Sequence, residues 1–146
     1  MRDTISWICN ELMSDTLPLL RPTANNENNV EPETDCYQLN EKSREPYNLE
    51  KLSFLGYFLG WSLISIGSLN LELPSAFWNR LCGGPDYVYS MKDVRSQDAL
   101  LANYLENIRT SAAQCTQEEF AEVFGDLHFV YEGVAANDGK AFDLCP

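Results

Sequence analysis

Apolar residues near the N-terminus recur with the spacing of one helix face. They stand at positions i, i+3, i+4, i+7 and i+8, and they are Ile5, Ile8, Cys9, Leu12 and Met13. This spacing places side chains along one side of an α-helix. Asp3 or Thr4 is of the residue type that precedes a first helical turn. We therefore expect an amphipathic helix at the start of the chain.

A run without charged residues extends from Leu52 to Leu71 and contains Gly56 and Gly60 in a GxxxG pattern. In an apolar segment of about 20 residues this pattern is typical of a membrane helix that dimerises. Four serines and Asn70 make the run less hydrophobic, and neither flank has the basic cluster that orients a membrane span. We therefore predict a buried helix over 49–66, ended by Gly67, whose glycines permit close packing, and no contact with a membrane.

The remaining patterns predict short elements. Extended chain is expected over 17–23, a flexible polar loop over 23–35, a strand over 36–40 and a second loop over 41–48. Alternating leucines over 68–74 indicate a brief strand or an extended connector. Helices are expected over 75–81, from about 98 after a loop or turn, and after the capping box Thr116–Glu119. Strands on either side of AANDG (135–139) indicate a hairpin. The fold class is α+β, mainly helical.

The net charge of −12 is unevenly distributed. Residues 1–50 and residues 101–146 each have a net charge of −6, whereas the segment between them is neutral. Nucleic acids and anionic membrane surfaces require Lys and Arg, so the charge argues against both as partners. The acidic flanks indicate a solvated surface, or one that attracts a basic partner.

The sequence contains little that indicates catalysis. The five cysteines, at 9, 36, 82, 115 and 145, are widely spaced without a CxxC motif, and the N-terminus resembles no secretory signal. These features favour a reducing compartment, the cytoplasm or the nucleus. The one histidine, His128, falls in a predicted strand, 13 residues from Cys115. We predict no catalytic residue, no metal site and no cofactor.

The phrase FLGYFLGW (54–61), followed by ISIGSLNLELPSAFWNRLCG (64–83), resembles the N-lobe of the HECT family of ubiquitin ligases. The family's next segment, an acidic one, corresponds to MKDVRSQD, with Val94 where leucine is usual. ISWICNELMSDTLPLLRPTANN and TDCYQLN resemble the HERC-type branch. LLANYLENIR and TQEEFAEVF are similar to the beginning of the small E2-binding subdomain. The resemblance covers nearly the whole chain, and its central phrase is the most specific part.

The resemblance implies a partial HECT N-lobe. Residues 1–98 would belong to its large subdomain, and residues 99–146 to an incomplete E2-binding subdomain. The C-lobe, whose cysteine accepts ubiquitin, would be absent, because none of the five cysteines stands in the family's acceptor motif. Cys145, in FDLCP, aligns with the middle of the N-lobe. The chain alone is therefore expected to be inactive.

The resemblance also assigns residues by position. The groove for the E2 would be formed by Leu101, Tyr104, Leu105 and Asn107, with Phe120 across from them. Ser111 stands where the family often has an aromatic residue. The same leucines have helical spacing and could instead belong to a core. The structural core would include Phe54, Gly56, Gly60, Trp61, Pro74 and Trp78.

Two functions follow from these expectations. In the first, the chain is the N-lobe portion of a HECT-type E3 ligase that recruits a ubiquitin-charged E2, and it meets ubiquitin and substrate only through the full-length ligase. In the second, it is a non-catalytic, stand-alone protein that binds an E2 or regulates a ligase. The mass of the native polypeptide distinguishes them, since only the first predicts a product far larger than 16.6 kDa.

Overall fold

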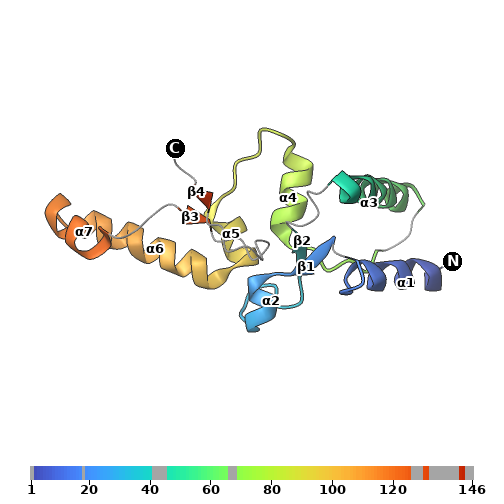
Figure 1. The fold of residues 1–146 in the computed structure, drawn as a ribbon, viewed down its shortest axis with the longest axis horizontal. Coiled ribbons are helices and arrows are strands. Elements are labelled where there is room, and N and C mark those ends of the chain that lie inside the picture. The colour runs from blue at the N-terminus through green and yellow to red at the C-terminus, as the bar shows by residue number, and fades with distance from the viewer. Residues whose placement is uncertain are drawn as a thin grey trace. The chain divides into compact units, whose positions relative to one another are not determined.

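The computed structural model describes residues 2–17, 19–40, 46–65, 69–125, 130–131 and 142–143. The chain divides into two compact units, residues 1–99 and residues 100–146, which are described separately. Helices dominate, and short strands form two antiparallel pairs (Figure 1). The predicted class, α+β and mainly helical, is confirmed.

The first unit contains five helices and one pair of strands among its described residues. In chain order they are α1 (Arg2–Leu12), β1 (Leu20–Pro22), α2 (Ala24–Asn28), β2 (Tyr37–Leu39), α3 (Pro46–Ile64), α4 (Ser75–Gly83) and α5 (Met91–Gln97). The next helix, α6 (Ala99–Gln114), begins at the last residue of this unit and continues into the second. The second unit also contains α7 (Gln117–Phe124), β3 (Val130–Tyr131) and β4 (Phe142–Asp143).

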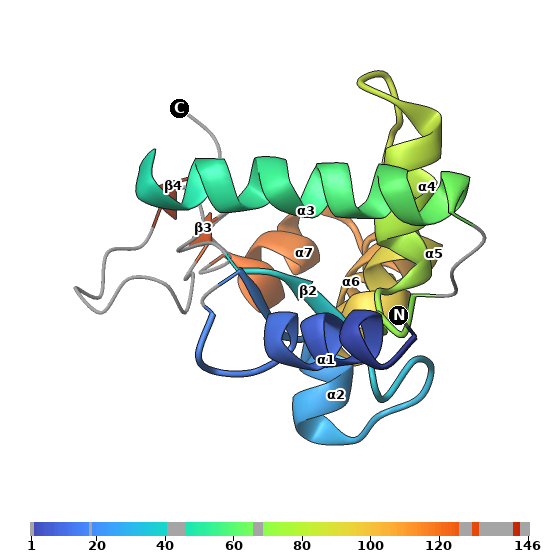
Figure 2. The same ribbon diagram turned by 90° about the vertical axis from the view of Figure 1, so that its right-hand side faces the viewer.

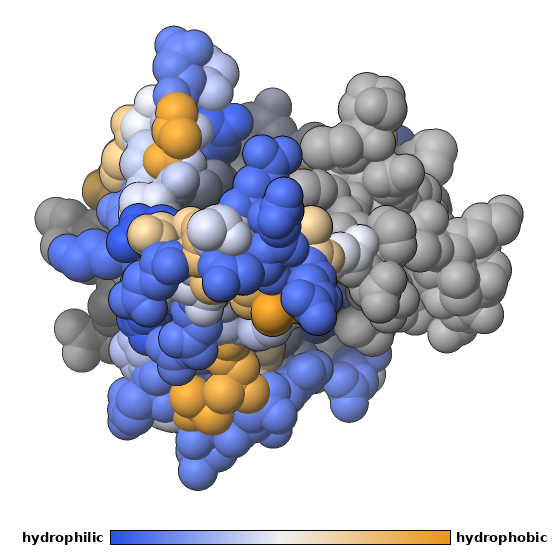
Figure 3. Space-filling view, turned by 90° about the vertical axis from the view of Figure 1, so that its left-hand side faces the viewer, coloured by the Kyte–Doolittle hydropathy of each residue, from blue (hydrophilic) through white to orange (hydrophobic). Residues whose placement is uncertain are grey.

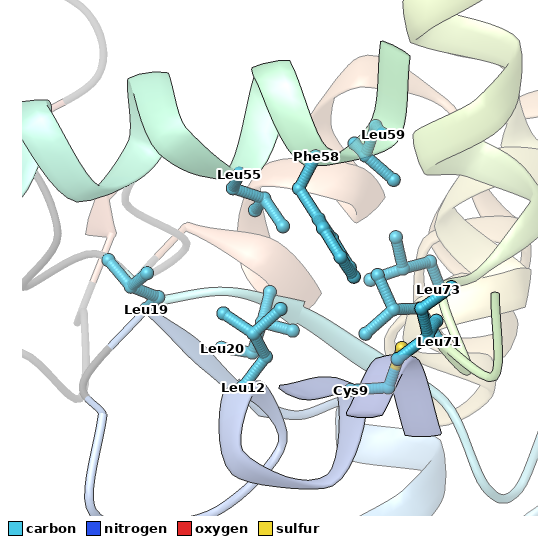
Figure 4. Packing of buried hydrophobic residues seen from close by; sticks show 10 residues of the cluster. Cys9, Leu12, Leu19, Leu20, Leu55, Phe58, Leu59, Leu71 and Leu73 are labelled. Atoms are coloured by element: carbon cyan, nitrogen blue, oxygen red, sulfur yellow. The ribbon is translucent and has the colours of Figure 1, made fainter. Parts of the chain in front are cut away.

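The core of the first unit lies between α1 and α3, which passes above α1 in two perpendicular views (Figure 1, Figure 2). The predicted apolar face of α1 points into it, with Ile5, Cys9 and Leu12 buried. Side chains from α1, β1, α3 and the segment 69–74 meet there (Figure 4). The cluster consists of Ile5, Cys9, Leu12, Leu19, Leu20, Leu55, Phe58, Leu59, Leu71 and Leu73. The sequence pattern thus predicted the inward face of α1 correctly.

The central helix α3 forms where it was expected, but most of the core residues predicted from the resemblance lie at the surface. Phe54, Trp61 and, on α4, Trp78 have between 37% and 53% of their surface exposed. Of the predicted residues, Pro74 is buried. The reason is that α3 has apolar residues on every side, and only the side with Leu55, Phe58, Leu59 and Ser62 faces the core.

The glycines of the GxxxG pattern do not mediate close packing in this structure. A Cβ built on Gly56 or Gly60 would have no atom of the described residues within 4 Å, apart from the helix's own backbone and their chain neighbours. The predicted close approach at these positions does not occur among the described residues. Gly67, the expected end of the helix, lies outside the described residues. No described helix is long and apolar enough to cross a membrane.

The strand pair of the first unit joins two segments predicted to be extended. β1 and β2 are antiparallel, with Leu20 opposite Leu39 and Pro22 opposite Tyr37. The segment 69–74 is an extended connector: Leu71 and Leu73 are buried, and the Glu72 carbonyl accepts a hydrogen bond from Tyr37 N at 2.6 Å. The predicted alternation of buried and exposed residues is thus confirmed, without a further strand.

Two segments predicted to be loops contain helices. Within 23–35, the Thr23 hydroxyl accepts from Asn26 N and begins the short helix α2. Within 91–97, Ser90 and Asp93 form a capping box that begins α5. Both helices are too short to show an apolar period, which is why periodicity did not reveal them.

In the second unit, the Thr116–Glu119 capping box begins α7, as predicted. β3 and β4 pair antiparallel, with Val130 opposite Asp143. These strands lie on the two sides of AANDG, so the predicted pairing is confirmed, while the turn itself lies outside the described residues. His128 and Cys145 lie outside them too.

Candidate functional site

The candidate site is the exposed side of α6. Its sequence, ALLANYLENIRTSAAQ, is rich in strong helix formers, which accounts for a helix of 16 residues. Ala99 and Ala102 are buried. Leu101, Tyr104 and Leu105 lie on the other side, and between 39% and 50% of each side chain's surface is exposed. Leucine and tyrosine thus point to solvent, whereas two alanines of the same helix are buried.

Helical geometry brings five apolar residues of α6 onto one face. We call them the α6 apolar face, and they are Leu100, Leu101, Tyr104, Leu105 and Ile108. The sequence analysis assigned three of them to partner binding but not Leu100 or Ile108. Leu100 is more exposed than any of those three, which its position in the pattern could not indicate.

The other two predicted site residues occupy different positions. Asn107 is exposed and follows Tyr104 by three residues, so it lies one turn further along the same side of α6. Phe120 lies on α7, where its ring packs against Phe124 with centroids 4.8 Å apart. Tyr104 stands about 15 Å along the axis before the end of α6, and α7 lies beyond that end (Figure 1). The resemblance implies that Phe120 lies across from Tyr104. The structure does not place it there.

Acidic residues gather on α7, the helix that follows α6. The first turn of α7 contains Glu118 and Glu119, and Glu122 follows one turn later. The Glu119 carboxylate accepts from Thr116 N at 2.8 Å and from the Thr116 hydroxyl at 2.9 Å, and these bonds lower its pKa. Viewed from the side of α6 and α7, the surface is largely hydrophilic, with hydrophobic residues in small separate areas (Figure 3). The carboxylates at the start of α7 suit a basic partner at that helix.

Two of the described cysteines are poorly suited to act as nucleophiles. Cys9 and Cys36 are buried, and burial raises the pKa of both thiols, that of Cys36 to about 11. Such thiols stay protonated at neutral pH and are poor nucleophiles. Cys82 is exposed and Cys115 is half-buried. Among the described residues no group of three His, Cys, Asp or Glu side chains could hold a metal ion.

A second apolar feature lies in the first unit. A hollow of about 400 Å³ is lined by residues of α1, of α3 and of the segment before β1: Trp7, Ile8, Glu11, Leu12, Leu17, Leu19, Lys51 and Phe54. Its walls are mainly apolar, with Glu11 and Lys51 as the charged members. This hollow is an alternative position for a partner's apolar side chain.

Comparison with known proteins identifies the class to which this chain belongs. The family model described as HECT-domain (ubiquitin-transferase) matches residues 6–146. The chain therefore belongs to the HECT family, and its mainly helical α+β fold is that expected of a partial HECT N-lobe.

Two curated relatives have the name E3 ubiquitin-protein ligase HERC2. The mouse protein is 32% identical and the human protein 31% identical to this chain over 118 residues. The alignment covers 81% of this chain but 2% of each relative, so the chain corresponds to a small part of their length. No solved structure matches the chain.

Proposed function

We propose that this chain is the E2-recruiting N-lobe portion of a HECT-type E3 ubiquitin ligase. The α6 apolar face, with Asn107 beside it, receives an apolar side chain of a ubiquitin-charged E2. Phe120 takes part where the E2 extends beyond the end of α6. The cysteine that accepts ubiquitin is supplied by another part of the polypeptide, so these 146 residues do not transfer ubiquitin by themselves.

The observation that carries this proposal is the exposure of Leu101, Tyr104 and Leu105. Leucines at helical spacing usually form a core, and a core assignment was the main alternative to partner binding. In the second unit they face solvent, whereas Ala99 and Ala102 of the same helix are buried. An exposed aromatic and leucine cluster is suited to hold one hydrophobic anchor of a partner.

The size of the face indicates weak binding. A single helix face contributes less area than a standard protein interface, which buries about 800 Å² on each partner. We expect a dissociation constant in the micromolar range, corresponding to about −8 kcal/mol. Weak binding suits a ligase that must release each discharged E2 before it binds the next.

Leu105→Ala tests the proposal. It removes an exposed side chain, so it should weaken E2 binding by about 5- to 150-fold, equivalent to about 1–3 kcal/mol. The thermal transition should hardly change. Calorimetric titration of the chain with a panel of purified E2 proteins measures the affinity, and circular dichroism measures the stability.

Leu63→Ala is the matched control. Leu63 is also an exposed leucine on a helix, at 85% exposure, but it lies on α3 in the first unit. The Leu63→Ala variant should bind the E2 with wild-type affinity. A large loss of stability in Leu105→Ala would instead assign Leu105 to a core, and equal effects of the two substitutions would remove the α6 apolar face from the interface.

A further inference from the structure

Asn25, on α2, has an unusual environment for an amide side chain. It is 1% exposed, and its amide bonds to three backbone groups. Its Nδ2 donates to Pro32 O at 2.7 Å and to Arg95 O at 2.9 Å, and its Oδ1 accepts from Ala99 N at 2.7 Å. Both amide hydrogens and the carbonyl oxygen are thus used. One residue thereby joins its own loop, the end of α5 and the start of α6.

The backbone of the short helix α2 holds Asn25 in place. Thr23, which is fully buried, caps the helix through its bond from Asn26 N at 3.2 Å. Asn29 ends the helix in the left-handed conformation, with φ 52°. Val30 N then donates to the Asn25 carbonyl at 2.9 Å. These local bonds fix the backbone of Asn25. Its side chain bonds to residues 70 and 74 positions later in the chain.

The bond to Ala99 acts at the base of the candidate site. The first N–H groups of a helix have no partner within the helix and need an acceptor from elsewhere. Asn25 supplies that acceptor to Ala99, the first residue of α6 and the last residue of the first unit. The α6 apolar face begins at the next residue. The same amide holds the carbonyl of Arg95 near the end of α5, so it secures both sides of the single-residue connection at Asp98.

We infer that Asn25 is a positioning residue for E2 recruitment: by bonding to Ala99 and Arg95 it limits the directions in which α6 presents its apolar face. This inference rests on the proposed function for its link to the E2. Its structural part, the restraint on α6, stands independently of any partner.

Two substitutions separate the roles of the amide. Asn25→Ala removes all three bonds. Asn25→Asp keeps an acceptor for Ala99 N–H, and a carboxylate is favoured at a helix N-terminus. It loses both donations, and it places negative charge beside two carbonyls. Both variants should therefore have lower melting temperatures, but only Asn25→Ala should leave Ala99 N–H without its acceptor.

Hydrogen exchange measured by NMR reports directly on that bond. The Ala99 amide should exchange at least about tenfold faster in Asn25→Ala, and it should stay protected in Asn25→Asp, because protection follows the local hydrogen bond. Leu55→Ala, a substitution in the core cluster, serves as a control that lowers stability without touching the bond. Equal exchange at Ala99 in all three variants would overturn the inference.

Native cysteines provide a second readout that does not depend on an E2. Cys82 lies exposed on α4 in the first unit, and Cys115 follows α6 in the second. Spin labels on this pair, with Cys145→Ser to remove the third site, measure the distance distribution between the units. We expect a broader distribution in Asn25→Ala than in wild type, Asn25→Asp or Leu55→Ala. A wild-type distribution as broad as that of Asn25→Ala would contradict the inference.

Binding connects the restraint to function. If α6 has the competent direction in about a tenth of the Asn25→Ala molecules, the apparent E2 affinity falls about tenfold. The apparent E2 affinity should fall much less in Leu55→Ala, measured at a temperature where both variants are folded. An equal loss in both variants would show that Asn25 acts through stability alone. If wild type binds no E2, the proposed function fails, while exchange and distances still decide the role of Asn25.

Discussion

Replacing Asp93 by asparagine should destabilise the first unit more than most single changes. Asp93 is 2% exposed, and its carboxylate bonds to groups from α4 and from the loop before α5. Oδ1 accepts from Asn79 Nδ2 at 3.0 Å. Oδ2 accepts from the Tyr87 hydroxyl at 2.8 Å, from Ser90 N at 2.8 Å and from the Ser90 hydroxyl at 2.6 Å. Asparagine can keep the first bond, but an amide NH2 group in place of Oδ2 cannot accept the other three.

The magnitude follows from these bonds. Loss of a helix cap costs about 1 kcal/mol. Hydrogen bonds to a charged group contribute about 1.5–3 kcal/mol each and neutral ones about 1, and the two hydroxyls can turn to other partners. We therefore expect Asp93→Asn to lower the free energy of unfolding at pH 7 by about 2–3 kcal/mol. Tyr87→Phe, which removes one donor and keeps the ring, should cost about 1 kcal/mol.

The effect should also depend on pH. Hydrogen bonds from Ser90, Asn79 and Tyr87 favour the ionised carboxylate, so the pKa of Asp93 lies well below its ordinary range in the folded protein. A lowered pKa contributes stability that is complete above the unfolded-state pKa of about 4, and that is lost as the pH falls toward the folded-state pKa. The difference between wild type and Asp93→Asn should therefore shrink between pH 7 and pH 3.

Urea unfolding followed by circular dichroism at several pH values measures this difference. A loss smaller than about 0.5 kcal/mol at pH 7 would refute the reasoning, because such a value is typical of an exposed surface position. A difference that stays constant down to pH 3 would show that the carboxylate charge is not what stabilises the loop.

Two further predictions concern the first unit. Gly60→Ala should raise the free energy of unfolding by about 0.5–1 kcal/mol, because Gly60 lies inside a helix with open space around it; destabilisation in urea unfolding would mean that this side of α3 is covered. Cys82 should react rapidly with a disulfide reagent at pH 8, whereas Cys36, with a pKa of about 11, should react only after unfolding. Equal rates for the two thiols in the native chain would contradict the burial of Cys36.

Local patterns in the sequence predicted much of the fold. The apolar spacing from Ile5 to Met13 identified both α1 and its inward face, because the apolar residues of that helix other than Trp7 share one side. The capping box at Thr116 identified the start of α7. The same type of signal, Ser90 and Asp93, stands before α5.

The facing of α3 could not be predicted in this way. Apolar residues surround this helix, so periodicity gives no direction, and the resemblance led to the wrong side. Leu55 and Phe58 are buried, whereas Phe54 and Trp61 are exposed. Which side becomes buried depends on α1 and β1, which are distant in sequence, and on the path of the segment 69–74 after the helix.

The candidate site was predicted only in part. The resemblance selected α6, and its exposed leucines agree with partner binding. The role of Asn25 had no local signal, since its amide bonds to Ala99, 74 residues later, from a segment expected to be a flexible loop. A buried amide within a polar stretch can be recognised only after the chain has folded around it.

The central claim, that the α6 apolar face recruits an E2, is tested most directly by an NMR titration. The isotopically labelled chain is titrated with each E2 of a panel, and shift changes are mapped onto the residues. We predict that for at least one E2 the largest changes fall between Leu100 and Ile108, with smaller ones on α7. Changes confined to the hollow between α1 and α3, or none with any E2, would contradict the account.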